Sequence, residues 1–181
     1  MLPTDTLKQE HQLILMVLDA AEREARTIAG GGVANADRLA AFVDFIRNFA
    51  DHCHHAKEED LLFVRMGEKG FPLQGGPVAV MLHEHELGRA HVAAIADNIA
   101  GAAAGIADAR TVVVERLAAY AALLRQHIHK EDNILYPMAD RVFSEADQAA
   151  LAADFERVER DEIGEGVHQR YEALAHELAG G

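Results

Sequence analysis

The sequence is short of the residue types on which several classes of protein depend. Its 181 residues include no tryptophan, one cysteine, four prolines and only 6% aromatic side chains. The lone Cys53 excludes an internal disulfide framework and favours a reducing, cytoplasmic location. No apolar run approaches the roughly 20 residues of a membrane span, and the first residues lack the basic and apolar segments of a secretory signal. We therefore expect a cytoplasmic protein without a membrane anchor.

Positive charge is also scarce. Lysine and arginine total 17 against 30 aspartates and glutamates, which gives a formal net charge of −13. Nucleic acids and anionic membrane surfaces are bound through basic patches, so we expect neither as a partner. Half of the residues are hydrophobic, and alanine and leucine dominate among them, which favours a helical core in a single domain.

Glycine and proline divide the chain into five expected helices, at about 5–29, 37–66, 77–101, 108–142 and 145–178. Pro137 is expected to bend or stop the fourth helix near its end, and Ser144 with Asp147 supplies cap interactions for the fifth. No strand-like alternation of any length is present. The sequence predicts an all-α fold: an antiparallel four-helix bundle over residues 1–142, with an additional C-terminal helix in residues 143–181 packed on the same domain.

One decapeptide pattern occurs twice. Residues 54–63 read HHAKEEDLLF and residues 127–136 read HIHKEDNILY, so a histidine and a glutamate four residues apart recur. A helix advances about 100° per residue, which stacks such a pair on one face. In the first copy, His54 falls within the apolar stripe and Glu58 at its edge, whereas His55 and Glu59 rotate about 100° away.

Each of the other long helices also directs one histidine toward the core. His127 shares the apolar face of the fourth helix with Glu131, His11 lies in line with the leucines of the first, and His85 lies on the apolar face of the third. Buried carboxylates are costly unless they are neutralised, paired or bound to metal. Two carboxylates facing four imidazoles form a ligand set for metal, so the predicted metal-binding residues are His11, His54, Glu58, His85, His127 and Glu131.

The remaining polar residues are interpreted as solvated or packing residues without a role in metal binding. Four of the eleven histidines have a glutamate four residues later, so one such pair is weak evidence, and His168 with Glu172 is interpreted as a solvated pair. Cys53 lies off the apolar stripe, which favours packing over metal ligation. Four residues of the decapeptides are assigned to the solvated outer faces of their helices: Lys57, Glu59, Lys130 and Asp132. The remaining histidines are interpreted as surface residues: His52, His55, His83, His91, His129 and His176.

The decapeptides, together with EHQLIL at residues 10–15 and PVAVMLHEHELGR at residues 77–89, resemble the hemerythrin-like (HHE cation-binding) family. The resemblance covers roughly residues 5–140 and implies a four-helix bundle that holds a non-haem di-iron centre. Its two iron ions would be bridged by Glu58, Glu131 and an oxo or hydroxo group. Imidazole and carboxylate donors without thiolate suit iron or manganese. The apolar residues 61–63 and 134–136 would pack below the metals and keep water out.

One departure from the oxygen-carrying members concerns the third and fourth helices. Those carriers have His-x-x-x-His on the third helix and His-x-x-x-x-Asp on the fourth, whereas here Arg89 follows His85 at that distance and Glu131 replaces the aspartate. About five bonds per iron would leave both irons with an exchangeable position. This pattern is nearer to the iron-centre repair and iron-sensing members, and it weighs against reversible oxygen carriage. Arg89 either hydrogen-bonds an anionic ligand or a bridging carboxylate, or extends to solvent.

Three functional classes are compatible with these patterns. The first is a non-haem di-iron protein that binds or senses a small ligand (O2 or NO) or iron itself. The alternative is an oxidoreductase or iron-centre repair protein that acts on NO or peroxide or donates iron. The third is a metal-free helical module that binds a partner, and the inward ligands argue against it. The first two use the same ligands with an open position, so the sequence does not separate them.

Overall fold

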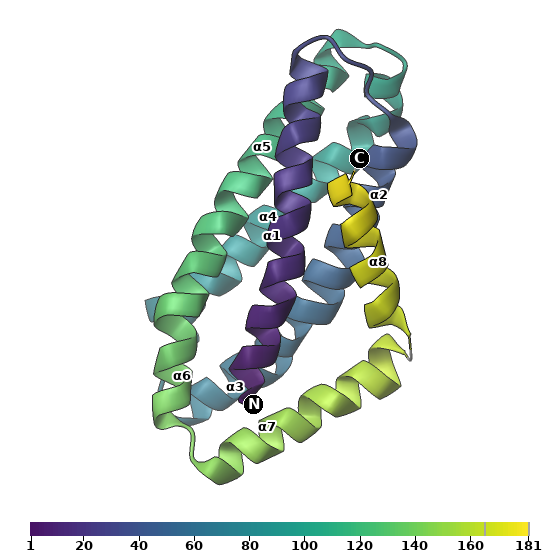
Figure 1. Ribbon diagram of the computed structural model, residues 1–181. Coiled ribbons are helices and arrows are strands. Elements are labelled where there is room, and N and C mark those ends of the chain that lie inside the picture. Colours follow the sequence, from purple (N-terminus) through teal and green to yellow (C-terminus); the bar gives the residue numbers. More distant parts are fainter. Residues whose placement is uncertain (165, 181) are drawn as a thin grey trace.

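A computed structural model of the chain describes residues 1–164 and 166–180 (Figure 1). Within these residues no strand is found, and the all-α prediction is confirmed. The helices, with η for a π-helix, are α1 (Pro3–Ala29), α2 (Ala36–Phe45), η1 (Ile46–His55), η2 (Glu58–Leu62), α3 (Phe63–Glu68), α4 (Gly76–Ala103), α5 (Ala107–Lys130), η3 (Glu131–Leu135), α6 (Tyr136–Val142), α7 (Glu145–Val158), η4 (Glu159–Ile163) and α8 (Val167–Gly180).

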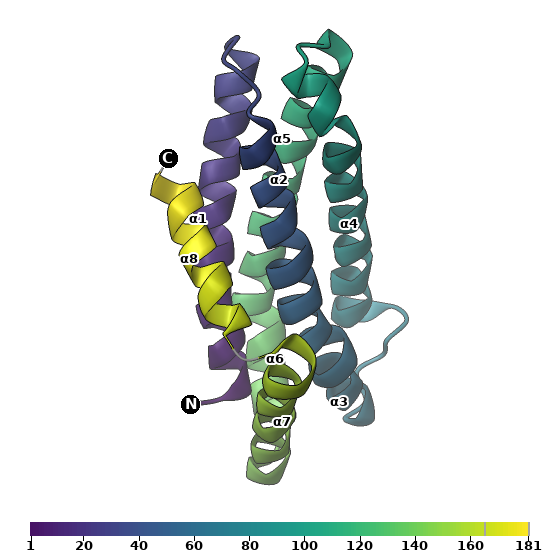
Figure 2. The same ribbon diagram turned by 90° about the vertical axis from the view of Figure 1, so that its right-hand side faces the viewer.

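The long helices pack side by side. α5 packs along both α1 and α4, and α2 packs along α4. Figures 1 and 2 show α2, η1, η2 and α3 continuing one another as one long stretch, and α5, η3 and α6 as another. The bounds of these stretches lie within about two residues of the predicted ranges, because glycine and proline residues mark the helix ends in the sequence. None of the described helices is both long and apolar enough to cross a bilayer.

The helix ends follow from local chemistry. The side chain of Asn35 accepts a hydrogen bond from the backbone N–H of Arg38 at 3.0 Å and caps the start of α2. Beyond the end of α1, Gly31 has a φ of 91°, which side chains other than hydrogen rarely allow. Pro137 lies in the first turn of α6, directly after the π-helix η3, and the helix does not stop there but continues to Val142.

The predicted C-terminal helix is divided into α7, η4 and α8. Gly164 has a φ of 100° and turns the chain between η4 and α8, which a single continuous helix would not allow. The cap at Ser144 is confirmed, since its hydroxyl accepts from the N–H of Asp147 at 3.2 Å. α8 packs against α1 and α2, and α7 packs against α1 and η2. Residues 165 and 181 of the predicted segment lie outside the described residues.

The apolar core forms two clusters, and the inward histidines lie between them. On α1, for example, Leu7 belongs to the smaller cluster and Ile14 to the larger one, with His11 between the two. The smaller cluster contains most of the apolar floor predicted from the decapeptides. Ile134 is the exception: it is 51% exposed, because it follows Glu131 within the π-helix η3, where α-helical phase no longer holds. The buried polar layer is therefore walled by apolar side chains at both ends.

Candidate metal centre

The six residues predicted to bind metal meet in one buried layer, and none of them is more than 1% exposed. Each histidine directs Nε2 toward a carboxylate or another ring. Nε2 of His127 lies 3.0 Å from Oε1 of Glu131, and Nε2 of His11 lies 3.3 Å from Oε2 of the same glutamate. Nε2 of His85 lies 3.4 Å from Oε2 of Glu58, and Nε2 of His54 lies 3.8 Å from it. The layer thus brings together donors from α1, η1, η2, α4, α5 and η3.

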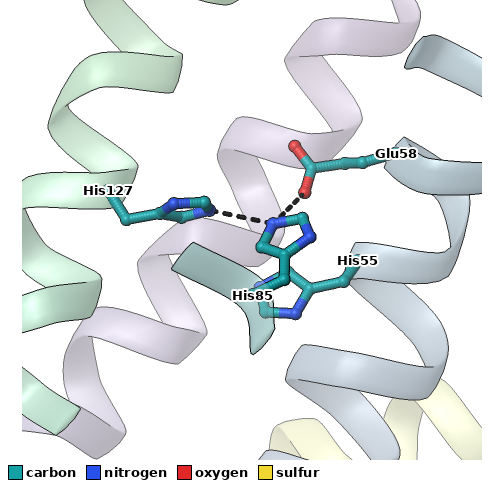
Figure 3. A group of neighbouring side chains, drawn as sticks. All are labelled: His55, Glu58, His85 and His127. Atoms are coloured by element: carbon teal, nitrogen blue, oxygen red, sulfur yellow. Dashed lines mark hydrogen bonds and ion pairs between the residues drawn. The ribbon is translucent and has the colours of Figure 1, made fainter. Parts of the chain in front are cut away.

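The donor atoms form two groups, each compact enough for one metal ion. The first group contains His55, Glu58, His85 and His127, and the second contains His11, His54 and Glu131. Within each group one donor atom per residue lies within 4.8 Å of all the others. Figure 3 shows the first group, with His127 entering from one side and His85 lying between it and Glu58.

The second ring nitrogen of each predicted histidine is held by a carboxylate. Nδ1 of His54 is hydrogen-bonded to Glu10 at 2.8 Å and Nδ1 of His127 to Glu84 at 2.9 Å. The two remaining contacts are His11 Nδ1 to Asp132 (2.8 Å) and His85 Nδ1 to Glu59 (2.6 Å). Such carboxylates fix the tautomer with the proton on Nδ1 and leave the Nε2 lone pair free for a metal.

The lysines of the two decapeptides complete this support. Lys57 donates to Glu10, and Lys130 donates to Glu84, so each lysine neutralises the carboxylate that holds the histidine three residues before it. The site is thereby built twice: residues 10, 11, 54 and 57–59 have counterparts at 84, 85, 127 and 130–132. The repeated decapeptide encodes an approximate two-fold arrangement of ligand, support and counter-charge.

Several residues interpreted as solvated therefore belong to the site. Lys57 has no exposed surface, and Glu59 and Asp132 bind ring nitrogens, so their assignment to outer faces was wrong. The supporting carboxylates Glu10 and Glu84 were not singled out at all. Their signal is nevertheless in the sequence, as the dipeptide Glu-His that begins both EHQLIL and EHELGR.

His55 is the main correction, because it is 4% exposed and lies inside the first group of donors. The prediction assumed an α-helical advance of 100° per residue, but Ile46–His55 forms the π-helix η1. A π-helix bonds N–H to the carbonyl five residues back, so a turn holds an extra residue and successive side chains diverge less. His54 and His55 consequently both face the centre.

The other interpretations have mixed outcomes. His52, His83, His129 and His176 are exposed as predicted, whereas His91 is half-buried. His168 is also half-buried, with Nδ1 3.9 Å from Glu159, in place of the solvated pairing with Glu172. Cys53 is buried, as packing predicted, and its thiol donates to Glu159 at 3.4 Å. A third group of possible donors contains Glu10, Cys53, Glu159 and His168. The ammonium group of Lys57 donates to Glu10 and Glu159 and already supplies a cation there.

Arg89 neither hydrogen-bonds a predicted bridging carboxylate nor simply extends to solvent. Its guanidinium donates to Asp51 at 2.6 Å, to Glu59 at 2.9 Å and to Glu86 at 2.5 Å. Since Asp51 and Glu59 contact Nδ1 of His55 and His85, Arg89 positions the carboxylates that orient two rings. A cavity of about 100 Å³ lies beside this assembly, lined by His55, His85, Arg89, Tyr120 and neighbouring residues.

The electrostatics of the layer call for a cation. Nε2 of His54, Oε2 of Glu58 and both carboxylate oxygens of Glu131 are buried without a hydrogen-bond partner, although ring nitrogens lie close by. Burial lowers the pKa of His54 to about 3. Burial acts the same way on His11 and His127, but nearby carboxylates outweigh it and raise the pKa of His11 to about 9 and of His127 to about 10. Uncompensated buried charge is costly, so protons or a metal must balance the glutamates.

The donor chemistry fits a metal. Nε2 of His85 and Nε2 of His127 face each other at 3.0 Å, while both Nδ1 atoms are bonded to carboxylates. Two metal–nitrogen bonds of about 2.1 Å at a right angle would place their nitrogens about 3.0 Å apart. Imidazole and carboxylate donors without a thiolate are the set that suits iron, manganese or zinc.

Comparison with known proteins agrees with this geometry. Residues 2–139 match the family described as the hemerythrin HHE cation binding domain. The chain belongs to this family. It is also 24% identical over 165 residues to an uncharacterized protein of Mycobacterium tuberculosis and to one of Mycobacterium bovis. The match covers 91% of this chain and 64% of each relative, so the chain spans less than two thirds of their length. No solved structure matches the chain significantly.

Proposed function

We propose that the chain is a non-haem di-iron protein that binds or senses a small ligand such as O2 or NO. Two iron ions, with an oxo or hydroxo bridge, would lie in an antiparallel four-helix bundle and be held by His11, His54, Glu58, His85, His127 and Glu131. The observation that carries the proposal is the buried layer of inward-facing Nε2 and carboxylate atoms, in which Nε2 of His54, Oε2 of Glu58 and both oxygens of Glu131 have no hydrogen-bond partner. The repeated donor set supplies one group of ligands per ion.

The protein's own residues would act by holding and shielding the ions. The supporting carboxylates keep each Nε2 lone pair directed inward, and Lys57 and Lys130 balance the charge of two of them. The two apolar clusters exclude water from both ends of the layer. Iron in such a site supplies binding or redox chemistry toward a small molecule.

The size of the neighbouring cavity favours a small ligand. Its volume of about 100 Å³ admits a molecule of a few heavy atoms, since one water occupies about 30 Å³ in the liquid. The hydroxyl of Tyr120, buried without a partner, lies on its wall. A cytoplasmic location belongs to the same proposal and rests on the single cysteine.

Metal analysis tests the proposal. Apoprotein loaded with Fe²⁺ without oxygen and then desalted is expected to retain about two irons per chain and to develop near-ultraviolet charge-transfer bands on oxidation. Glu58→Gln and Glu131→Gln are expected to abolish retention of the pair, whereas Glu115→Gln, at an exposed position of α5, is expected to retain it. Glu59→Gln should be intermediate, because Glu59 holds Nδ1 of His85. Only trace iron in folded wild-type protein would refute the di-iron proposal.

A second measurement separates ligand binding from turnover. Stoichiometric spectral titration with NO, without steady-state consumption of NO or peroxide, is the expected result for a binding or sensing protein. Sustained consumption would instead support the oxidoreductase or repair function, which uses the same open position.

A further inference from the structure

The two groups of donors differ by one residue. Under the approximate two-fold arrangement, Glu58, His85 and His127 correspond to Glu131, His11 and His54, which is the whole of the second group. His55 alone has no counterpart in that group. Its equivalent in the second decapeptide is Ile128, a buried member of the larger apolar cluster. The first group therefore has an additional imidazole where the second has a hydrocarbon side chain.

His55 is supported in the same way as the other inward histidines. Its Nδ1 lies 3.3 Å from Oδ1 of Asp51, and Asp51 is in turn held by Arg89. Nε2 of His55 is buried and has no hydrogen-bond partner. The two positions that build this support are apolar in the other half, where Leu124 replaces Asp51 and Leu15 replaces Arg89. The support and the histidine thus occur together or not at all.

The ring is also placed against the first group. It stacks on His85 with centroids 3.8 Å apart and an interplanar angle of 15°, and its centroid lies 5.8 Å from that of His127. The stacked arrangement is visible in Figure 3, where the two rings overlap below Glu58. A ring nitrogen of His55 lies within 4.8 Å of a donor atom of each of Glu58, His85 and His127. Donors on opposite sides of one octahedral ion lie about 4.3 Å apart, so ligation would require a shift of up to about 0.5 Å together with a turn of the His55 ring out of its stack on His85.

We propose that His55 is a fifth imidazole ligand, at the metal position of Glu58, His85 and His127. This inference rests on the proposed function, because it presupposes that the layer holds metal. It makes the two positions chemically unequal: the first takes three imidazoles, and the second takes two, from His11 and His54. The π-helix η1 is the structural cause, since it turns two consecutive histidines into the core.

Counting ligated imidazoles tests the inference without any measurement of activity. Co²⁺ added to the apoprotein serves as a paramagnetic probe, and each ligated histidine contributes one strongly shifted, exchangeable N–H proton resonance. All five rings hold Nδ1 against a carboxylate, so these protons should exchange slowly enough to be observed. We expect five such resonances in the wild type, four in His55→Ala, and five in His52→Ala, a control at an exposed position of η1.

The affinities supply a second readout. His55→Ala is expected to weaken the binding of one of the two Co²⁺ ions by at least the 10- to 100-fold typical of losing a supporting contact, and to leave the other unchanged. Four resonances in the wild-type protein, or five in His55→Ala, would overturn the inference and leave His55 as a stacking partner of His85. The wild-type count decides even if His55→Ala fails to fold. Absence of any shifted resonance, with no Co²⁺ bound, would instead refute the metal site itself.

Discussion

The ammonium group of Lys57 is held by Glu159, which lies beyond the part of the chain that matches the family. Lys57 also donates to Glu10, the carboxylate on Nδ1 of His54, so η4 is linked to the metal layer by a chain of three contacts. The equivalent Lys130 is 33% exposed at its side chain, and its ammonium group donates to Glu84. The C-terminal segment thus adds a second carboxylate to the lysine in one half of the site.

Glu159→Gln should therefore destabilise the fold and weaken metal binding near His54. Removing one partner of a buried ammonium leaves its charge poorly compensated, and the loss is expected to be about 1–3 kcal/mol because Glu159 itself is partly exposed. Urea denaturation of the metal-free protein measures this difference. The control is Glu156→Gln, which changes an exposed residue that lines the same surface pocket as Glu159. Equal midpoints for the two variants would show that Glu159 contributes nothing to Lys57.

Tyr136→Phe should weaken metal binding without unfolding the protein. The Tyr136 hydroxyl donates to Oε1 of Glu58 at 2.6 Å, and the equivalent position in the first decapeptide is Phe63, which fits the same apolar cluster. Loss of this hydrogen bond is expected to lower metal affinity by about 10- to 100-fold. Tyr171→Phe is a matched control, because that hydroxyl contacts Asp44, away from the centre. Unchanged affinity in Tyr136→Phe would remove the hydroxyl from the support of Glu58.

Helical periodicity predicted the inward direction of His11, His85 and His127 because these three residues lie in α-helices. His11 and His85 lie within regular α-helices, so a phase of 100° per residue placed them correctly. His55 and Ile134 lie in π-helices, where the same phase fails. Nothing in the sequence marks the start of a π-helix, so the inward rotation of His55 was not predictable by phase.

The supporting contacts were missed for a different reason. Glu10, Glu84 and Lys57 act on side chains of other helices, and contacts across a bundle depend on how helices pack. Composition indicates only that charged residues are usually solvated. A buried lysine such as Lys57 contradicts that expectation, and it is stabilised here because two carboxylates surround it.

Metal binding should release protons at neutral pH. In the metal-free protein the pKa of His11 is raised to about 9 and that of His127 to about 10, so both rings are protonated at pH 7.5, whereas His54, with a pKa lowered to about 3, is neutral. A ligated ring is neutral, so binding is expected to displace the protons of His11 and His127 at pH 7.5, and this contribution falls as pH rises through 9 to 10. A titration with Co²⁺ in weakly buffered solution, read by a pH indicator, measures the release.

The same shifts predict how the metal-free protein responds to pH. Raised pKa values mean that the stabilisation from His11 and His127 is fully present below about pH 6.5 and is lost as pH rises through 9 to 10. In the Co²⁺ titration, His11→Gln at a Co²⁺ concentration that saturates the variant should release about one proton fewer than the wild type. A release that is the same in His11→Gln and wild type would show that His11 is not the protonated group.

Removal of the metal should lower thermal stability and loosen the helices that carry the ligands. A ligand that binds only the folded chain stabilises it by about 2.7 kcal/mol when its concentration is 100 times its dissociation constant. For a chain of 181 residues this corresponds to a fall of about 5–11 °C in Tm when one ion is removed. Calorimetry of iron-loaded and metal-free protein at pH 7.5 measures the shift.

Hydrogen exchange should show lost protection in η1, η2 and η3, which hold His54, Glu58 and Glu131. The end of α1 near Ile28, in the larger apolar cluster, serves as an internal reference and should be unchanged. Equal protection around His54 and His127 in both forms would mean that the layer is pre-formed by protons and supporting carboxylates, and that the metal serves chemistry alone.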